Sequence, residues 1–136
     1  MLSRVYVGER ADKSLSMLKG RTGLLPTLLC RIGFCLSLAD PSVPDPTLYT
    51  SDGNAREFNL PTLTGQYTEL FFALLRERLA QDGLDPERNF EAQFKAHLNR
   101  GIGYLDIRVK TLEDIADLVA AAQAQDSQPQ PGGLHG

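Results

Sequence analysis

The chain has 136 residues, of which 42% are hydrophobic and 23% charged, and its formal net charge is −3. This length fits one domain with an ordinary core, and no apolar run approaches the ~20 residues that a membrane-spanning helix needs. The first ten residues have no apolar signal-peptide core, so we expect a cytoplasmic protein with no membrane partner.

The chain begins with a short predicted strand. Residues 4–7 alternate in period two, with Val5 and Val7 on one face and Arg4 and Tyr6 on the other. No second strand is predicted, so we expect this strand to pair with the same strand of a second copy. A helix over residues 9–19 follows, and Gly20 is the residue expected to end it.

The second predicted helix, residues 26–39, is apolar on almost every side. It starts at Pro26 and is stopped by Asp40-Pro41. A helix that is apolar all round must be buried all round, so part of it is expected to pack against another copy. Its cysteines, Cys30 and Cys35, lie about 140° apart on the helix and match no metal-binding spacing, so neither a disulfide nor a metal is predicted.

The rest of the chain is predicted to be a loop and three more helices. Residues 41–61 are rich in proline and lack periodicity. A helix is expected from residue 63 or 64 to 81 with an apolar stripe of Tyr67, Leu70, Phe71, Leu74, Leu75 and Leu79 and with Arg76, Glu77 and Arg78 on its wet side. The next begins at Asp85-Pro86 with a stripe of Phe90, Phe94 and Leu98 and is expected to kink or break at Gly101 and Gly103. The last begins at Thr111 and docks through Leu112, Ile115, Leu118 and Val119.

These elements predict a mostly α fold. A short N-terminal strand is followed by helices, residues 1–40 have the order of a ribbon-helix-helix module, and additional helices complete the C-terminal part. We expect one domain over residues 1–122 and a disordered tail over 123–136, because the tail has too few apolar residues to order itself.

Positive charge is concentrated in the N-terminal part. Residues 1–40 hold six Lys/Arg and three Asp/Glu (6 − 3 = +3), whereas the remainder holds eight and fourteen (8 − 14 = −6). This asymmetry predicts DNA contacts, mainly to phosphate, from Arg4, Arg10, Lys13, Lys19 and Arg21, with solvated surface charge as the alternative.

Two further sets of residues are candidates for assembly or structure. The Gly20–Gly23 turn is interpreted as a phosphate contact, a subunit contact or an ordinary turn, and the oligomerisation candidates are Gly20, Gly23, Leu28, Ile32 and Leu36. Arg31 is expected to pair with a carboxylate or to lie at a subunit interface. His97 is expected to be structural or exposed. No nucleophile–base–orienter set is present, so we predict no catalysis and no cofactor.

Four segments, in this order, resemble the DNA sulfur modification protein DndE family over roughly residues 2–119. They are Leu18-Lys19-Gly20-Arg21-Thr22-Gly23, Leu29-Cys30-Arg31-Ile32-Gly33-Phe34-Cys35-Leu36-Ser37-Leu38, Pro44-Asp45-Pro46 with Leu48-Tyr49, and Phe94-Lys95-Ala96-His97-Leu98-Asn99-Arg100-Gly101. The chain departs from the expected pattern at Leu25, where a small hydroxyl residue should precede the proline.

The resemblance implies a tetrameric accessory subunit of the bacterial machinery that replaces a phosphate oxygen of DNA with sulfur. It implies binding of DNA, with a preference for nicked duplex, and contact with the other subunits of that machinery. Two alternatives remain. The chain is either a scaffold of the same complex with little DNA affinity or a ribbon-helix-helix transcriptional repressor, although a repressor leaves the later helices unexplained.

Overall fold

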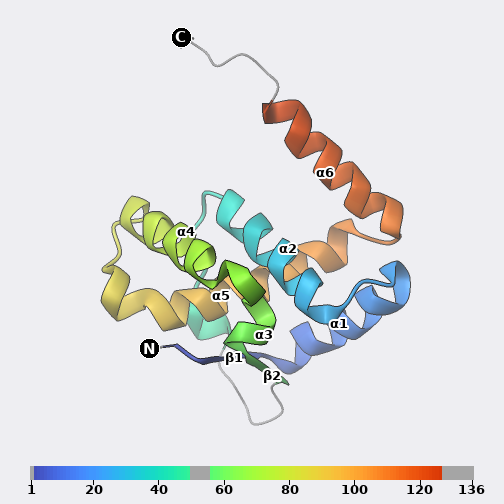
Figure 1. Ribbon diagram of the computed structural model, residues 1–136. Coiled ribbons are helices and arrows are strands. Elements are labelled where there is room, and N and C mark those ends of the chain that lie inside the picture. Colours follow the sequence, from blue (N-terminus) through green and yellow to red (C-terminus); the bar gives the residue numbers. More distant parts are fainter. Residues whose placement is uncertain (1, 50–55, 127–136) are drawn as a thin grey trace.

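The computed structural model describes residues 2–49 and 56–126 and confirms a mostly α fold with a strand near the N-terminus (Figure 1). In chain order the elements are β1 (Arg4–Val7), α1 (Glu9–Thr22), α2 (Pro26–Ala39), the 3-10 helix η1 (Pro46–Tyr49), β2 (Arg56–Asn59), α3 (Leu60–Thr64), the 3-10 helix η2 (Gly65–Tyr67), α4 (Thr68–Gln81), α5 (Pro86–Arg108) and α6 (Leu112–Asp126).

Helix α5 is the centre of the fold, and its most extensive partner is α2. The two helices meet where Gly33 faces Gly101, so closely that a Cβ added to Gly101 would lie 1.9 Å from the carbonyl oxygen of Gly33. The predicted break at Gly101 and Gly103 is therefore wrong. Helix α5 runs unbroken for 23 residues. Because Gly101 has no side chain, the backbones of α5 and α2 can cross at this short distance.

Aromatic rings fill the core between α2, α4 and α5. The ring of Phe34 on α2 lies 4.7 Å from that of Phe94 on α5 and 5.7 Å from that of Phe71 on α4, measured between centroids. All three side chains are buried. Such edge and tilted contacts add to the stabilisation that burial alone provides. Helix α2 buries Leu29, but Leu25 and Leu28 are 64% and 38% exposed, so one of its faces is uncovered in the single chain.

Strand β1 pairs in antiparallel register with β2 of the same chain, with Val5 opposite Phe58 and Val7 opposite Arg56. The expected pairing with a second copy is wrong, because β2, which lies within the predicted loop 41–61, supplies the partner. The other edge of β1 is also occupied. Asn99 on α5 accepts a hydrogen bond from the Gly8 N–H through Oδ1 and donates one to the Tyr6 carbonyl through Nδ2.

Helix α1 is longer than predicted, and α2 has its predicted bounds. Gly20 lies inside α1, which continues to Thr22 and ends at Gly23, whose φ of 77° is left-handed. A left-handed residue at this position favours glycine. Helix α2 begins at Pro26 and gives way to Asp40, as expected.

The segment after β2 forms three pieces where one helix was predicted. Helices α3 and η2 precede α4, which ends at Gln81 as expected. The apolar stripe predicted for α4 is confirmed only in part. Phe71, Leu75 and Leu79 are buried, whereas Leu70 and Leu74 are exposed. Tyr67 on η2 is also exposed. The prediction also placed Arg78 on the wet side, yet its side chain is buried.

Helix α6 projects away from the other helices (Figure 1). Asp114 accepts hydrogen bonds from the backbone N–H groups of Lys110 and Thr111, which fixes the start of the helix. Only Ile115 is well buried, and the predicted docking of Leu112 and Val119 is wrong, since these side chains are 49% and 53% exposed. The helix ends at Asp126, beyond the predicted start of the tail, and residues 127–136 lie outside the described residues.

Candidate nucleic-acid interface

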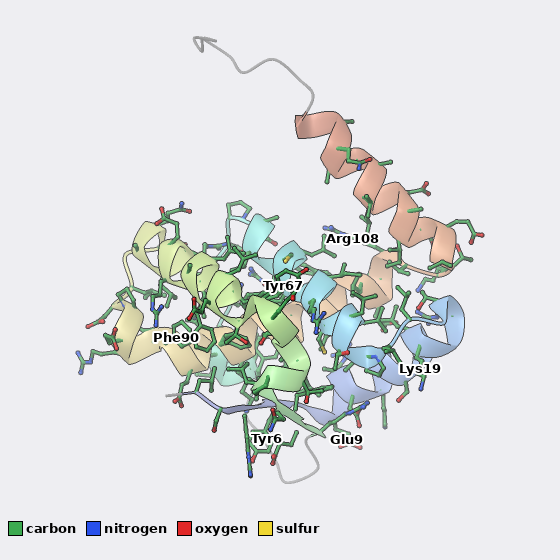
Figure 2. The ribbon with its side chains drawn as sticks, viewed as in Figure 1. Tyr6, Glu9, Lys19, Tyr67, Phe90 and Arg108 are labelled. Atoms are coloured by element: carbon green, nitrogen blue, oxygen red, sulfur yellow. The ribbon has the colours of Figure 1, made fainter. Side chains whose placement is uncertain are left out.

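Three of the predicted DNA-binding residues, Arg10, Lys13 and Lys19, are exposed on α1. Figure 2 shows Glu9 and Lys19 at opposite ends of this helix. The Lys13 ammonium lies 3.7 Å from the Glu9 carboxylate, but both side chains are largely in solvent, so this ion pair is weak. Within residues 2–49 and 56–126, Arg10 and Lys19 form no ion pair. Helix α1 therefore presents cations that are available to an anionic partner.

The other two predicted cations have acidic partners. Arg4 on β1 lies 3.3 Å from Glu57 on β2 in an exposed pair. Arg21 donates to the Asp106 carboxylate at 2.9 Å, and Asp106 also accepts from the Ser14 hydroxyl. The Arg21–Asp106 pair is only about a quarter to a third exposed and ties the end of α1 to α5. Arg21 thus holds two helices together, a role that its sequence context did not reveal.

The predicted oligomerisation residues lie on two surfaces of the chain. Gly20 and Gly23 are exposed, and a Cβ added to either meets nothing within 4 Å. On α2, Leu28 is exposed, whereas Ile32 and Leu36 are partly buried. Tyr67, Leu70 and Leu74 form a second exposed apolar set, although their helical spacing predicts core positions.

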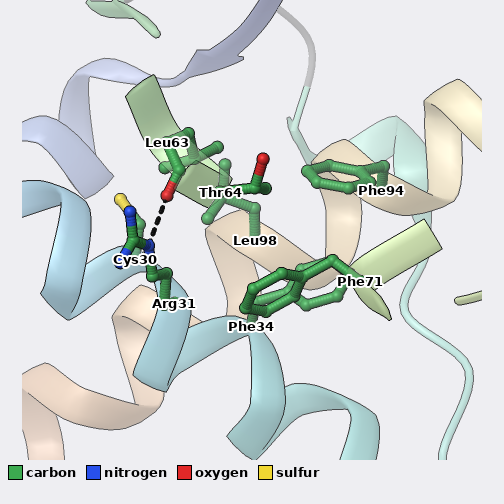
Figure 3. Close-up of a pocket in the computed structure, with 8 residues that line it drawn as sticks. All are labelled: Cys30, Arg31, Phe34, Leu63, Thr64, Phe71, Phe94 and Leu98. Atoms are coloured by element: carbon green, nitrogen blue, oxygen red, sulfur yellow. Dashed lines mark hydrogen bonds between the residues drawn. The ribbon is translucent and has the colours of Figure 1, made fainter. Parts of the chain in front are cut away.

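Arg31 is held by backbone, so its predicted pairing with a carboxylate is wrong. Its Nε donates to the Leu63 carbonyl at 2.6 Å (Figure 3), and an Nη donates to the Thr62 carbonyl. These carbonyls lie at the end of the short helix α3, where backbone acceptors lack helical partners. Beside Arg31 is a cavity of about 10 Å³ between aromatic rings, which is room for about one water molecule and not for a ligand.

A serine and a histidine meet at the α2–α5 interface without forming an accessible catalytic pair. Ser37 Oγ lies 2.8 Å from His97 Nδ1, and Arg100 Nε donates to the same Oγ at 2.9 Å. Both Ser37 and His97 are fully buried. Burial lowers the pKa of His97 to about 4, assisted by the Arg100 cation, so the imidazole is neutral at pH 7 and shares a hydrogen bond with the serine hydroxyl. Of the two expectations for His97, structural or exposed, the exposed one is wrong, because the side chain is buried.

The described residues contain no single helix that could span a membrane and no cluster that could hold a metal ion. Across residues 2–49 and 56–126 no single helix is long and apolar enough to span a bilayer, and α1 and α2 meet that criterion only as a pair bent by 109°. In the same ranges, no three His, Cys, Asp or Glu side chains gather closely enough to hold a metal ion.

The comparisons with known proteins agree on one family. The family model of DNA sulphur modification protein DndE matches residues 4–112. No curated protein matches the chain.

Two solved structures share the fold. The crystal structure of DndE from Escherichia coli B7A, involved in DNA phosphorothioation modification, has a TM-score of 0.63 and 21% identity, with 77% of this chain and 97% of that chain covered. The structure of a DndE mutant with two glycines replaced by lysine has a TM-score of 0.58 and 18% identity, with the same coverage. Because the family model matches far more than half of the residues, this chain belongs to the DNA sulphur modification protein DndE family.

Proposed function

We propose that this chain is a non-catalytic, DNA-binding accessory subunit of the DNA phosphorothioation machinery and acts in the cytoplasm, with a preference for nicked duplex. Family membership supports the link to phosphorothioation. The observation that carries DNA binding is the exposure of three cations on α1, Arg10, Lys13 and Lys19, in a chain whose residues 1–40 have a net charge of +3 and whose residues 41–136 have a net charge of −6. Phosphate oxygens of the DNA backbone are the natural partners of such cations.

Arg4 and Arg21 belong to the proposed DNA-binding set with a smaller expected contribution. Each has an acidic partner, Glu57 and Asp106 respectively, which DNA must displace or share. The three free or weakly paired cations of α1 are therefore expected to dominate the salt dependence of binding.

We also propose that the chain forms a homo-oligomer, a tetramer by family resemblance, through α2 and the C-terminal end of α1 around Gly20 and Gly23. The exposed Leu28 and its partly buried neighbours Ile32 and Leu36 support the α2 contact.

A salt series tests DNA binding directly. Fluorescence anisotropy should show binding to nicked and intact duplex at low salt, with affinity falling steeply as salt rises because bound cations release counterions. Lys19→Gln should weaken binding and reduce the slope of log K against log salt by about 1. Arg88→Gln is the matched control, because Arg88 is exposed on the first turns of α5. Absence of binding at low salt would contradict the proposal.

The second candidate function is a scaffold that holds other subunits of the same complex and touches DNA weakly. Helix α6 favours it, because this projecting helix carries Glu113, Asp114, Asp117 and Asp126 with no Lys or Arg and exposes Leu112 and Val119. Co-purification of those subunits by a chain with no measurable DNA affinity would select this function. We do not propose a ribbon-helix-helix repressor, because β1 pairs within its own chain.

A further inference from the structure

A groove of about 720 Å³ lies where the start of α1, the 3-10 helix η1 and the second half of α5 meet. Its walls include Arg10, Tyr49, Arg100 and Tyr104. Sites for small molecules and cofactors commonly have volumes of roughly 300–1,000 Å³, so this groove can take a ligand of nucleotide size. The groove is distinct from the small cavity beside Arg31 and is open to solvent.

Two cations line the groove without an ion pair in the described parts of the chain. Arg10 is exposed, and Arg100 directs its hydrogen bonds to neutral partners, the hydroxyl and carbonyl oxygens of Ser37 and the hydroxyl of Ser42. The lining also includes Glu9 and Asp106, of which Asp106 pairs with Arg21 at 2.9 Å, whereas the exposed Lys13–Glu9 pair is weak. Arg10 and Arg100 are therefore the two lining cations that a bound anionic group can contact.

Aromatic and aliphatic surfaces lie beside these cations. Tyr104 is fixed, because its hydroxyl donates to Asp40 and the guanidinium carbons of Arg100 and Arg108 lie 5.5 and 5.4 Å from its ring centroid. Tyr49 lines the groove with Leu48 and Ile107, whose side chains are 71% and 76% exposed. A tyrosine and two exposed aliphatic side chains next to cations that form no ion pair suit a ligand that has both a planar base and a phosphate.

We propose that this groove binds one nucleoside phosphate, with its base against Tyr49, Leu48 and Ile107 and its phosphate between Arg10 and Arg100. Arg10 is also one of the proposed DNA-binding residues, so the groove and that set share one cation. On the proposed function, the nucleotide is an unpaired one in a DNA strand bound along α1. A free nucleotide has the same chemistry and is the other source.

Anisotropy titrations test the groove with two labelled duplexes of equal length, one intact and one carrying a single-nucleotide flap. The wild-type chain should prefer the flap, and Tyr49→Ala should reduce that preference about fivefold or more because it removes a stacking surface. Affinity for the intact duplex should be unchanged. Ile107→Glu should act in the same direction by placing a negative charge at the rim, whereas Val119→Glu on α6 is the matched control.

A titration with AMP distinguishes a free nucleotide from a nucleotide within DNA as the ligand of the groove. Binding is followed by tyrosine fluorescence, because the chain contains no tryptophan. Tyr49-dependent binding of AMP without binding of any duplex supports the groove and contradicts the proposed DNA binding. Duplex binding with no flap preference, or with a preference that survives both Tyr49→Ala and Ile107→Glu, overturns the groove and leaves the proposed function standing. If neither AMP nor any DNA binds, both proposals fail.

Discussion

Gly101 is the position where a single methyl group should do most damage. A Cβ added at Gly101 would lie 1.9 Å from the carbonyl oxygen of Gly33. The clash is between the backbones of two packed helices, α5 and α2. Since neither can move alone, Gly101→Ala should lower the free energy of unfolding by about 3 kcal/mol or more. Urea denaturation measures the change.

Gly103 provides the control two residues further along the same helix. A Cβ there meets nothing within 4 Å, and alanine is favoured over glycine in a helix by about 1 kcal/mol. Gly103→Ala should therefore leave stability unchanged or raise it. If both variants lost the same stability, the contact between Gly33 and Gly101 would not explain the loss.

The same two glycines show what residue patterns leave undecided. In the sequence both are helix-weakening residues, and a break was the natural prediction. Which of them faces another backbone depends on how α2 crosses α5, and that crossing joins residues far apart in the chain. Arg78 is a similar case, because its neighbours predict an exposed face while its partners come from residues 38–42 and from Asp82.

The segment that links α2 to η1 is held in place by arginine side chains from the helices beneath it. Arg78 on α4 donates to the carbonyl oxygens of Leu38 and Ser42 at 2.7 and 2.6 Å and pairs with Asp82, with both side chains 7% exposed. Removal of one partner from a buried ion pair typically costs about 3–5 kcal/mol, because the other charge is left uncompensated. Arg78→Ala should therefore destabilise the chain by that amount in thermal or chemical denaturation.

Arg76 on the same helix is the matched control. Its guanidinium carbon lies 5.3 and 5.9 Å from the Phe90 and Phe72 rings, and its side chain is exposed. Arg76→Ala removes only an exposed cation–π contact, so its cost should be about 1 kcal/mol or less. Equal losses for the two variants would show that Arg78 contributes no more than a surface cation.

At the level of elements, strong local signals were sufficient for some helices and insufficient for the strand pair. Pro26 and Asp40 mark the ends of α2, and Asp85 accepts the backbone N–H groups of Glu87 and Arg88 as an N-cap should. Strand β2 has only four residues, Arg56–Asn59, and a single buried side chain, Phe58. Its pairing with β1 is decided by tertiary contacts, which no local pattern encodes.

For the whole molecule, the family and the charge asymmetry were accessible from the sequence, whereas the surfaces were not. Four motifs predicted the DndE family, which the family model confirms. The cations of the N-terminal part were found by counting charges, but counting could not separate Arg21, which joins α1 to α5, from Lys19. The groove could not be predicted from the sequence, because its residues come from three segments that only the fold brings together.

Two exposed apolar surfaces make the proposed oligomer testable. Leu28 on α2 and Leu70 on α4 are 38% and 54% exposed. If copies associate through α2, Leu28→Glu should reduce the molar mass measured by light scattering, because a buried carboxylate without a partner opposes association. Leu70→Glu should leave the mass unchanged. The reverse result would assign the contact to α4, and a monomeric wild-type chain would contradict the oligomer.

The pairing of β1 has a consequence for the time course of synthesis. Strand β1 leaves the ribosome before its partners, because Val7 pairs with Arg56 and Gly8 donates to Asn99. At about 5–20 residues per second, translation reaches these partners on the order of seconds later. For those seconds the strand emerges with both of its edges open, and only later synthesis supplies the groups that close them.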